Sequence, residues 1–297
     1  MKSLENIIKN AVDLHVHIGP EIIPRKFLLQ ELITAEQGCI AGIGVKNHFF
    51  PTIAMSPTRN KNTAPFIVYS VTLNRSLGGF NSEIIRASAQ LSDKPIIVWF
   101  PTLCTQSFLS GQRKEIPLEW IDPTFRSSIV LRDANAIQPL TIVTGKNELS
   151  PEVVDVLKTI KDNNCILATG HLSPNEIKKL VKYASEQFGI TKIIITHPIY
   201  QKINMSITDQ KKMVALGAVI EHCFSMVSID NIPVQRIAQQ IKQVGARNCI
   251  LSSDVGQTFT PKPSEALFEF AQLLEHNGIS RNELQEMLIT NPSRLIS

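Results

Sequence analysis

Two histidines separated by one residue, close to the start of the chain, could do metal chemistry. They lie in the run DLHVH (residues 13–17). Apolar and polar residues alternate there, and this alternation predicts a β-strand over 11–17. Side chains two residues apart on a strand point to the same face, so Asp13, His15 and His17 are expected to project together. Two imidazoles on one face at a strand end are suited to form half of a transition-metal site.

Three more residues of this chemical kind end later predicted strands. His171 ends a strand over 165–171, His197 follows the apolar run at 192–196, and Asp254 ends a strand that begins at 249. Each has a simpler interpretation on its own, because a histidine before a helix can be a turn residue and Asp254 can be the N-cap of the turn that follows. Their joint occurrence at strand ends favours a shared site.

Alternating strands and helices are predicted to position these residues. Strand patterns begin near residues 11, 40, 65, 95, 165, 192, 218 and 249, and helical patterns separate most of them. Eight such units in 297 residues predict an α/β fold, a (β/α)8 TIM barrel that forms a single domain over 1–297. No GxGxxG follows any strand, so an open dinucleotide-binding sheet has no support. In a barrel, the carboxyl ends of the strands share one mouth, which is the active-site face.

The segment 101–148 interrupts the repeat after the fourth strand. It is longer than a strand-to-strand connection needs, and it contains two short strand-like runs at 128–131 and 139–143. We predict an inserted β-hairpin that lies outside the barrel wall and covers part of the mouth. Arg126 and Arg132 could contact an anionic substrate group from this insert, but the preferred interpretation is that they are solvated surface charges.

Composition excludes several classes of protein. The chain is 43% hydrophobic and 19% charged, which is enough for a sizeable core. A net charge of +4 without a basic run, and 6% aromatic residues, predict no nucleic-acid partner. The sequence shows neither a signal-peptide pattern nor an apolar run of about 18 residues, so we expect a cytoplasmic protein with no membrane partner. The five cysteines form no CxxC pair and are expected to be reduced, buried thiols.

The strand-end residues, taken as a set, resemble the ligand layout of the amidohydrolase superfamily. HVH (15–17) follows the first strand, and the fifth, sixth and eighth strands end in His171, His197 and Asp254. The ending NPSRL (291–295) also resembles the common close of that superfamily. The resemblance covers the whole chain and implies a (β/α)8 hydrolase with one or two divalent metal ions, commonly zinc. It implies that the metal ligands are His15, His17, His171, His197 and Asp254, and that Asp254 and His197 are also catalytic.

One position departs from the pattern of that superfamily. Many binuclear members have a lysine or glutamate ligand after the fourth strand, whereas this chain has WFPT (99–102) there. Lys46, after the second strand, could supply a carboxylated bridge or a substrate contact, or it could be an ordinary polar residue near the mouth. Mononuclear and binuclear sites therefore both stay open. His48, Glu221 and His222 also lie near strand ends, where we expect them to contact the ligands or to be structural.

The leading hypothesis is metal-dependent hydrolysis of a small-molecule amide, ester, lactone or phosphoester. Zinc lowers the pKa of bound water from ~15.7 towards ~7, and Asp254 would move the proton of the attacking water. A metal-dependent decarboxylase or other lyase on the same barrel is the first alternative, and a non-catalytic metal-binding relative is the second. A carboxylate aimed into an imidazole cluster argues against the second. The partner is then a small-molecule substrate, and the sequence leaves the substrate, the metal and the formation of a homo-oligomer open.

Overall fold

Short parallel strands form the centre of the molecule. The computed structural model describes residues 3–56 and 64–297. Within these residues the strands are β1 (Val12–His17), β2 (Gly42–Lys46), β3 (Phe66–Val68), β4 (Ser70–Thr72), β5 (Ile97–Trp99), β6 (Ile166–Ala168), β7 (Ile193–Ile195), β8 (Val219–Cys223) and β9 (Cys249–Ser252). They pair in the order β1-β2-β3 and β4-β5-β6-β7-β8-β9, and every pairing between them is parallel.

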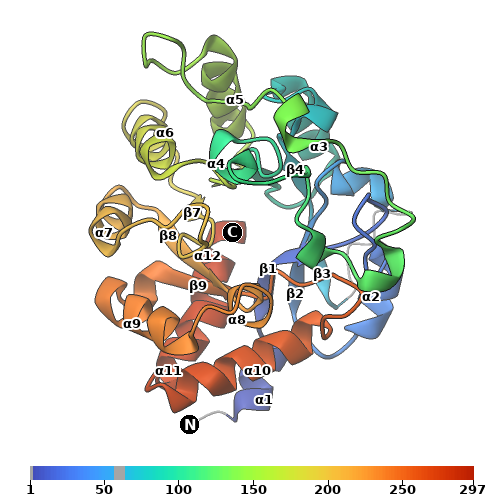
Figure 1. The fold of residues 1–297 in the computed structure, drawn as a ribbon. Coiled ribbons are helices and arrows are strands. Elements are labelled where there is room, and N and C mark those ends of the chain that lie inside the picture. Colours follow the sequence, from blue (N-terminus) through green and yellow to red (C-terminus); the bar gives the residue numbers. More distant parts are fainter. Residues whose placement is uncertain (1–2, 57–63) are drawn as a thin grey trace.

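Two connections join these sheets into a barrel. Tyr69 alone separates β3 from β4, so the two segments occupy one strand position, and the Ser70 hydroxyl donates to the Val45 carbonyl at 2.6 Å to hold β4 beside β2. The last strand returns to the first through a parallel bridge between Val16 and Val255. The eight predicted strand positions and the α/β barrel are therefore confirmed (Figure 1).

Helices surround the strands. They are α1 (Leu4–Lys9), α2 (Leu29–Ala35), α3 (Ser82–Leu91), α4 (Gln106–Leu109), α5 (Pro151–Asp162), α6 (Pro174–Glu186), α7 (Ile207–Ala215), α8 (Ser225–Ser228), α9 (Val234–Val244), α10 (Pro263–His276), α11 (Arg281–Gln285) and α12 (Asn291–Ile296). Serine side chains cap the starts of α5 and α6. Ser150 accepts from the backbone N–H of Val153, and Ser173 forms a capping box with Glu176.

A bulge in β1 changes which side chains face the inside of the barrel. The pairing with β2 shifts in register between Asp13 and Val16. As a result, Leu14 joins a buried apolar cluster with Trp99, while Val16 belongs to the larger core. The expectation that Asp13 shares a face with the two histidines is wrong, because its carboxylate accepts from backbone N–H groups of the β1–β9 junction instead. Bulges commonly re-aim side chains in this way next to active sites.

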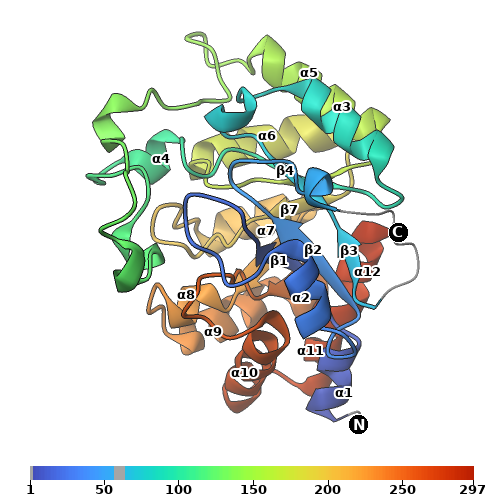
Figure 2. The same cartoon turned by 90° about the vertical axis from the view of Figure 1, so that its right-hand side faces the viewer.

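The segment between β5 and α5 does not contain the predicted hairpin. It carries α4 and short 3-10 turns at Leu118–Trp120, Pro123–Phe125 and Ala134–Ala136, joined by isolated bridges. The runs at 128–131 and 139–143 form no strand, so the hairpin prediction is wrong. Most of their apolar residues pack onto the core, whereas Val130 is 94% exposed, and only isolated bridges at Leu140 and Val143 pair them with other segments. Figure 2 shows the segment running along one side of the barrel.

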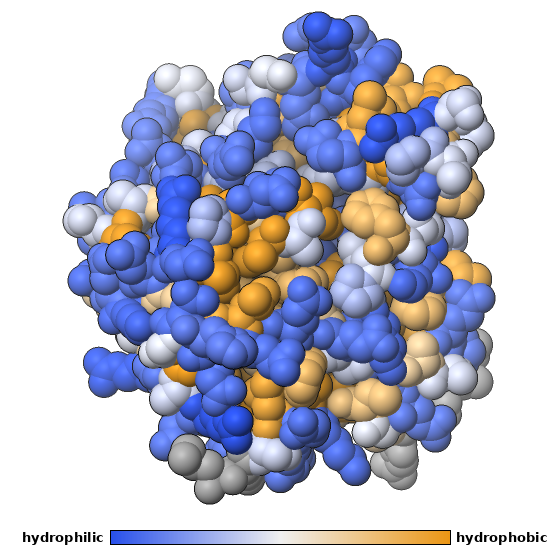
Figure 3. Space-filling view, turned by 60° about the horizontal axis from the view of Figure 1, so that its bottom comes forward, coloured by the Kyte–Doolittle hydropathy of each residue, from blue (hydrophilic) through white to orange (hydrophobic). Residues whose placement is uncertain are grey.

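The surface and the cysteines add few constraints on function. Hydrophobic residues gather near the centre of the face seen in Figure 3, framed by hydrophilic residues. Within the described part of the chain, no helix has the length and apolar character needed to cross a membrane. All five cysteines are free thiols, as predicted, and four of them are buried; the expectation of burial is wrong for Cys39, which is partly exposed.

Candidate functional site

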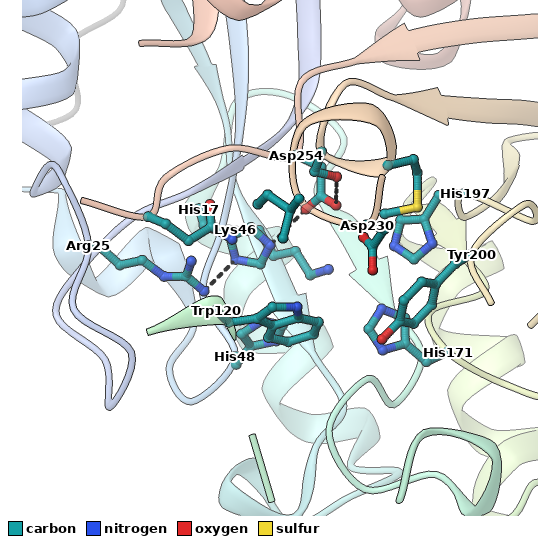
Figure 4. Close-up of a pocket in the computed structure, with 14 residues that line it drawn as sticks. His17, Arg25, Lys46, His48, Trp120, His171, His197, Tyr200, Asp230 and Asp254 are labelled. Atoms are coloured by element: carbon teal, nitrogen blue, oxygen red, sulfur yellow. Dashed lines mark hydrogen bonds and ion pairs between the residues drawn. The ribbon is translucent and has the colours of Figure 1, made fainter. Parts of the chain in front are cut away.

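A cavity lies where the strands end, and most of the predicted residues line it. His17, Lys46, His48, His171, His197 and Asp254 contribute side chains to its wall (Figure 4). The side chains of His15 and Glu221 lie behind this wall, fully buried, in contact with it. The structure therefore brings the five predicted metal ligands to one place, as expected for residues at the carboxyl ends of barrel strands.

His15 has a polar contact at each ring nitrogen. Its Nδ1 lies 3.2 Å from Oε2 of Glu221, and its Nε2 lies 3.0 Å from Oδ1 of Asp254 and 2.9 Å from Nζ of Lys46. A metal-binding histidine usually donates its second N–H to a carboxylate or a carbonyl, which fixes the tautomer. Glu221 is in the position to do this for His15, and Nε2 is then left with a lone pair directed at Asp254.

His17 shares the same carboxylate oxygen. Its Nε2 lies 3.0 Å from Oδ1 of Asp254, and its Nδ1 lies 3.2 Å from Nη2 of Arg25, which also forms an ion pair with Glu21. The other oxygen of Asp254 accepts from the Ser225 hydroxyl at 2.6 Å. Although burial alone would raise it, the neighbouring His15 and His17 hold the pKa of Asp254 well below its usual value.

The donor set around Asp254 fits a divalent cation. If Nδ1 of His15 donates to Glu221, the Nε2 lone pair faces both the Lys46 Nζ and the Asp254 oxygen, a position that a cation could also occupy. Among the residues that the structure describes, two groups of three side chains have ligand atoms within 4.8 Å of one another: His15, Cys223 and Asp254, and His17, Glu21 and His48. Imidazole, thiolate and carboxylate are all zinc ligands. Sequence reasoning missed Cys223 and Glu21 because nothing in their spacing marks them.

His171 and His197 face the cavity but lie in neither of these two groups. The Nδ1 of His171 is 2.8 Å from the Thr102 carbonyl, which leaves its Nε2 without a proton, whereas Nδ1 of His197 is buried with no partner among the described residues. Burial lowers the pKa of His197 to about 4 and that of His171 well below its usual value. Both rings are therefore neutral near pH 7, the form that binds metals or accepts hydrogen bonds.

Lys46 lies deep in the wall. Its side chain is 1% exposed, and its Nζ lies 4.3 Å above the ring of Trp99, the residue that ends β5. Trp99 also packs on His15, with ring centroids 4.4 Å apart. Burial lowers the pKa of Lys46 to about 8, so the amine is close to the pH range in which it becomes neutral.

Of the three residues expected to support the ligands, His48 and Glu221 lie at the site and His222 does not. His48 lines the cavity, with Nδ1 3.0 Å from the Thr102 hydroxyl, and Glu221 contacts His15 as described above. His222 does not join the site. It is fully buried, it does not line the cavity, and both of its ring nitrogens lack a partner in the described structure. Adjacent residues on a strand face opposite sides, so Glu221 and His222 cannot both point inward.

Backbone strain marks two of the strand ends. His197 and Asp254 have φ values of 20° and 53°, a region that residues other than glycine rarely adopt. Such conformations cost of order 1–3 kcal/mol and are concentrated at functional sites. Next to Asp254, Gly256 approaches β1 so closely that an added Cβ would lie 2.2 Å from the His17 carbonyl oxygen. The backbone is thus arranged around the Asp254–His17 contact.

Several cavity residues come from loops and gave no signal in the sequence. Arg25 follows β1, Trp120 belongs to the segment between β5 and α5, and Tyr200 and Asp230 follow β7 and α8. Trp120 shows that this segment reaches the cavity, whereas Arg126 and Arg132 do not line it. Arg132 instead pairs with Glu115 and is largely exposed, in line with the preferred interpretation of a surface charge.

Comparison with known proteins adds a family and a fold. Residues 10–221 match the model of a family of unknown function, DUF6282. No curated protein matches the chain. Among solved structures, an amidohydrolase from Pseudomonas aeruginosa is similar with a TM-score of 0.62 and 9% identity, over 99% of this chain and 98% of that one.

Two further solved structures extend the comparison. A probable dipeptidase, PvdM, from Pseudomonas aeruginosa has a TM-score of 0.60 and 12% identity, with 98% of this chain and 96% of that chain covered. A putative 2-pyrone-4,6-dicarboxylic acid hydrolase from Pseudomonas putida has a TM-score of 0.54 and 12% identity, with 96% and 97% covered. At these identities the similarity shows the fold, and the predicted barrel is confirmed over nearly the whole chain.

Proposed function

The chain belongs to the family of unknown function DUF6282, and from this premise we propose that it is a metal-dependent hydrolase of a small-molecule amide, ester, lactone or phosphoester. The observation that carries the proposal is the oxygen of Asp254 that lies 3.0 Å from Nε2 of both His15 and His17. Three atoms of the kinds that bind zinc meet there, and Glu221 supports the His15 ring from behind. This is the arrangement of ligands and carboxylate partner that metal-binding histidines use.

We assign the ligands from this geometry. His15, His17 and Asp254 would hold a divalent ion, with zinc first, and His171 and His197 would complete the site or face the substrate. When bound, the ion supplies a Lewis acid and lowers the pKa of water.

Among the chain's own groups, the Asp254 carboxylate is ionised and can accept a proton from the attacking water. It can then deliver that proton to the leaving group. Ser225 orients this carboxylate through its 2.6 Å hydrogen bond. Trp120 and Met226 in the wall exclude bulk water, and this strengthens the electrostatic interactions inside.

Metal analysis of the purified protein tests the proposal. We expect about one or two equivalents of zinc by mass spectrometry after chelation and reloading, and we expect His15→Asn/His17→Asn to lose most of it. His276→Asn, at the exposed end of α10, is the matched control and should keep the wild-type content. The loaded and chelated proteins are then compared on a panel of the four substrate classes, where hydrolysis should depend on the metal. Equal metal contents in the wild type and the double variant would contradict the proposal.

The same analysis separates the two roles of Lys46. As a carboxylated bridge between two ions, it would be needed for the second equivalent, so Lys46→Met would halve the content of a binuclear site. As a substrate contact, it would leave the content unchanged. The position of Nζ over the Trp99 ring favours a free ammonium over a carboxylated amine, because cations bind to aromatic faces.

A further inference from the structure

One carboxylate in the cavity has no partner. The Asp230 side chain lines the cavity close to His171, His197 and Tyr200 (Figure 4). Within residues 3–56 and 64–297, no hydrogen bond or ion pair involves its oxygens. Burial, together with the nearby carboxylates of Asp254 and Glu119, raises the pKa of Asp230 to about 7. Ionised Asp230 is thus partly removed from water and lies near other carboxylates. Both effects raise the free energy of its charged form, and a bound cation would lower it.

The position of Asp230 is fixed by the fold. Its backbone N–H donates to the Ser225 carbonyl at 3.2 Å, and the N–H of Ile229 donates to the same carbonyl at 2.8 Å. These bonds close the turn that follows α8, the short helix directly after β8. The side chain does not cap a helix or accept a backbone hydrogen bond, so the fold gives it no structural role.

Asp230 is also not placed as a metal ligand. It lies in neither group of side chains whose ligand atoms come within 4.8 Å of one another. The cationic groups that line the cavity are Arg25 and Lys46. Arg25 is paired with Glu21, Lys46 contacts His15, and neither forms an ion pair with Asp230. Within residues 3–56 and 64–297 the Asp230 carboxylate thus stays available to a ligand that enters the cavity.

The surroundings of Asp230 select the chemistry of that partner. Tyr200 is buried beside it, with its ring centroid 5.4 Å from that of His171 and 5.5 Å from that of His197. A carboxylate next to an aromatic face is a typical site for a cationic nitrogen. Arg25 and Lys46 line another part of the wall and would repel a cationic nitrogen. A cationic ligand group is therefore expected beside Asp230 and Tyr200.

From this geometry we infer that the substrate carries an aliphatic ammonium group that Asp230 and Tyr200 bind. The inference rests on the proposed function in that it takes this cavity to be the substrate site. It narrows the substrate class to small molecules that bear an amine in addition to the hydrolysed bond. Binding requires no covalent step, and the amine nitrogen keeps its protons throughout.

A pair of probes with the same alkyl chain tests the ammonium site. n-Butylammonium and 1-butanol are titrated by NMR at pH 8 and constant ionic strength, with zinc-loaded and with chelated protein. Wild type should prefer the ammonium probe by roughly tenfold or more, the ratio that a hydrogen bond to a charged group provides. Asp230→Asn should lose this preference, and Tyr200→Phe should keep most of it. Asp155→Asn, an exposed carboxylate on α5, should keep it fully.

The outcomes separate this inference from the proposed function. Equal affinity of wild type for the two probes would overturn the ammonium site, and so would an unchanged preference in Asp230→Asn. A loss of bound zinc in Asp230→Asn would identify Asp230 as a metal ligand and would also overturn the ammonium site. An ammonium preference in a protein that binds no zinc would support the site while contradicting the hydrolase proposal. Circular dichroism of each variant shows that the fold is retained.

Discussion

Two sides of the cavity differ in how completely their polar atoms are paired. On the side of Asp254, both carboxylate oxygens have contacts, and both ring nitrogens of His15 and of His17 do as well. On the side of Asp230, the carboxylate has no partner among the described residues, and neither has Nδ1 of His197. Paired groups hold one geometry before any ligand arrives, which suits a metal site. Unpaired groups gain their partner from the ligand, which suits substrate recognition.

The largest effect is expected when the basic oxygen of Asp254, on the paired side of the cavity, is removed. Asp254→Asn keeps the size and one oxygen, so the fold and part of the metal should remain. Turnover should fall by roughly 10²–10⁴-fold, the usual contribution of a general base. Steady-state kinetics on the substrate found in the panel measures the effect. Normal turnover with a lowered melting temperature would show that Asp254 only stabilises the fold through its contacts with His17 and Ser225.

Glu221 tests whether the paired side is prearranged for a metal. Glu221→Gln keeps the shape but replaces one acceptor oxygen with an amide donor, so it no longer fixes the proton of His15 on Nδ1. We expect the zinc affinity to fall by about 10–100-fold, as for other carboxylates behind a metal-binding histidine. Competition with a chromophoric chelator measures it, and Asp155→Asn serves as a control on a distant carboxylate. An unchanged affinity would mean that Glu221 only fills space beneath His15.

His222 is a buried ring that is unpaired in the described structure and lies outside the cavity. It therefore allows the effect of an unpaired imidazole on the free energy of unfolding to be measured without a ligand. Burial lowers the pKa of His222 to about 4, whereas an unfolded histidine titrates near 6.5. As the pH falls through this window, the unfolded chain takes up a proton that the folded chain excludes, so stability falls. His222→Leu removes this effect and leaves no hydrogen bond unmade.

The expected size of this effect is small but measurable. Between pH 6.5 and pH 5.5, wild type should lose about 1 kcal/mol more of its free energy of unfolding than His222→Leu does. Urea denaturation of the metal-free proteins at both pH values checks this. Parallel losses in the two proteins would show that His222 is solvated or has a partner in solution.

The features that could be predicted from the sequence depend on local patterns. Parallel strands buried on both faces appear as short apolar runs, and this is why the eight strand positions were found. His171, His197 and Asp254 were recognisable because each follows such a run directly. The helix starts at Ser150 and Ser173 are of the same local kind, because capping is a contact within one turn.

The features that were missed depend on contacts between distant segments. The bulge in β1 arises where Gly44 of β2 lets the backbone of Leu14 approach, since an added Cβ would lie 2.6 Å from the Leu14 carbonyl oxygen. No alternation pattern reveals such an approach. Arg25 and Asp230 enter the cavity from loops, whose paths depend on the packing of the whole barrel. The apolar runs of the segment after β5 looked like strands because packing on a core requires the same side chains.

The bridge that closes the barrel also determines when the site can exist. Asp254 meets His17 across 237 residues, and its backbone N–H donates to the carbonyl of His15 at 2.8 Å. During synthesis, the first strand leaves the ribosome long before the last, so the paired histidines remain without their carboxylate for most of that time. Contacts of such long sequence separation form late and slowly. Completion of the proposed ligand set is therefore expected among the last events of folding, and the proposed metal site would not be complete before β9 is in place.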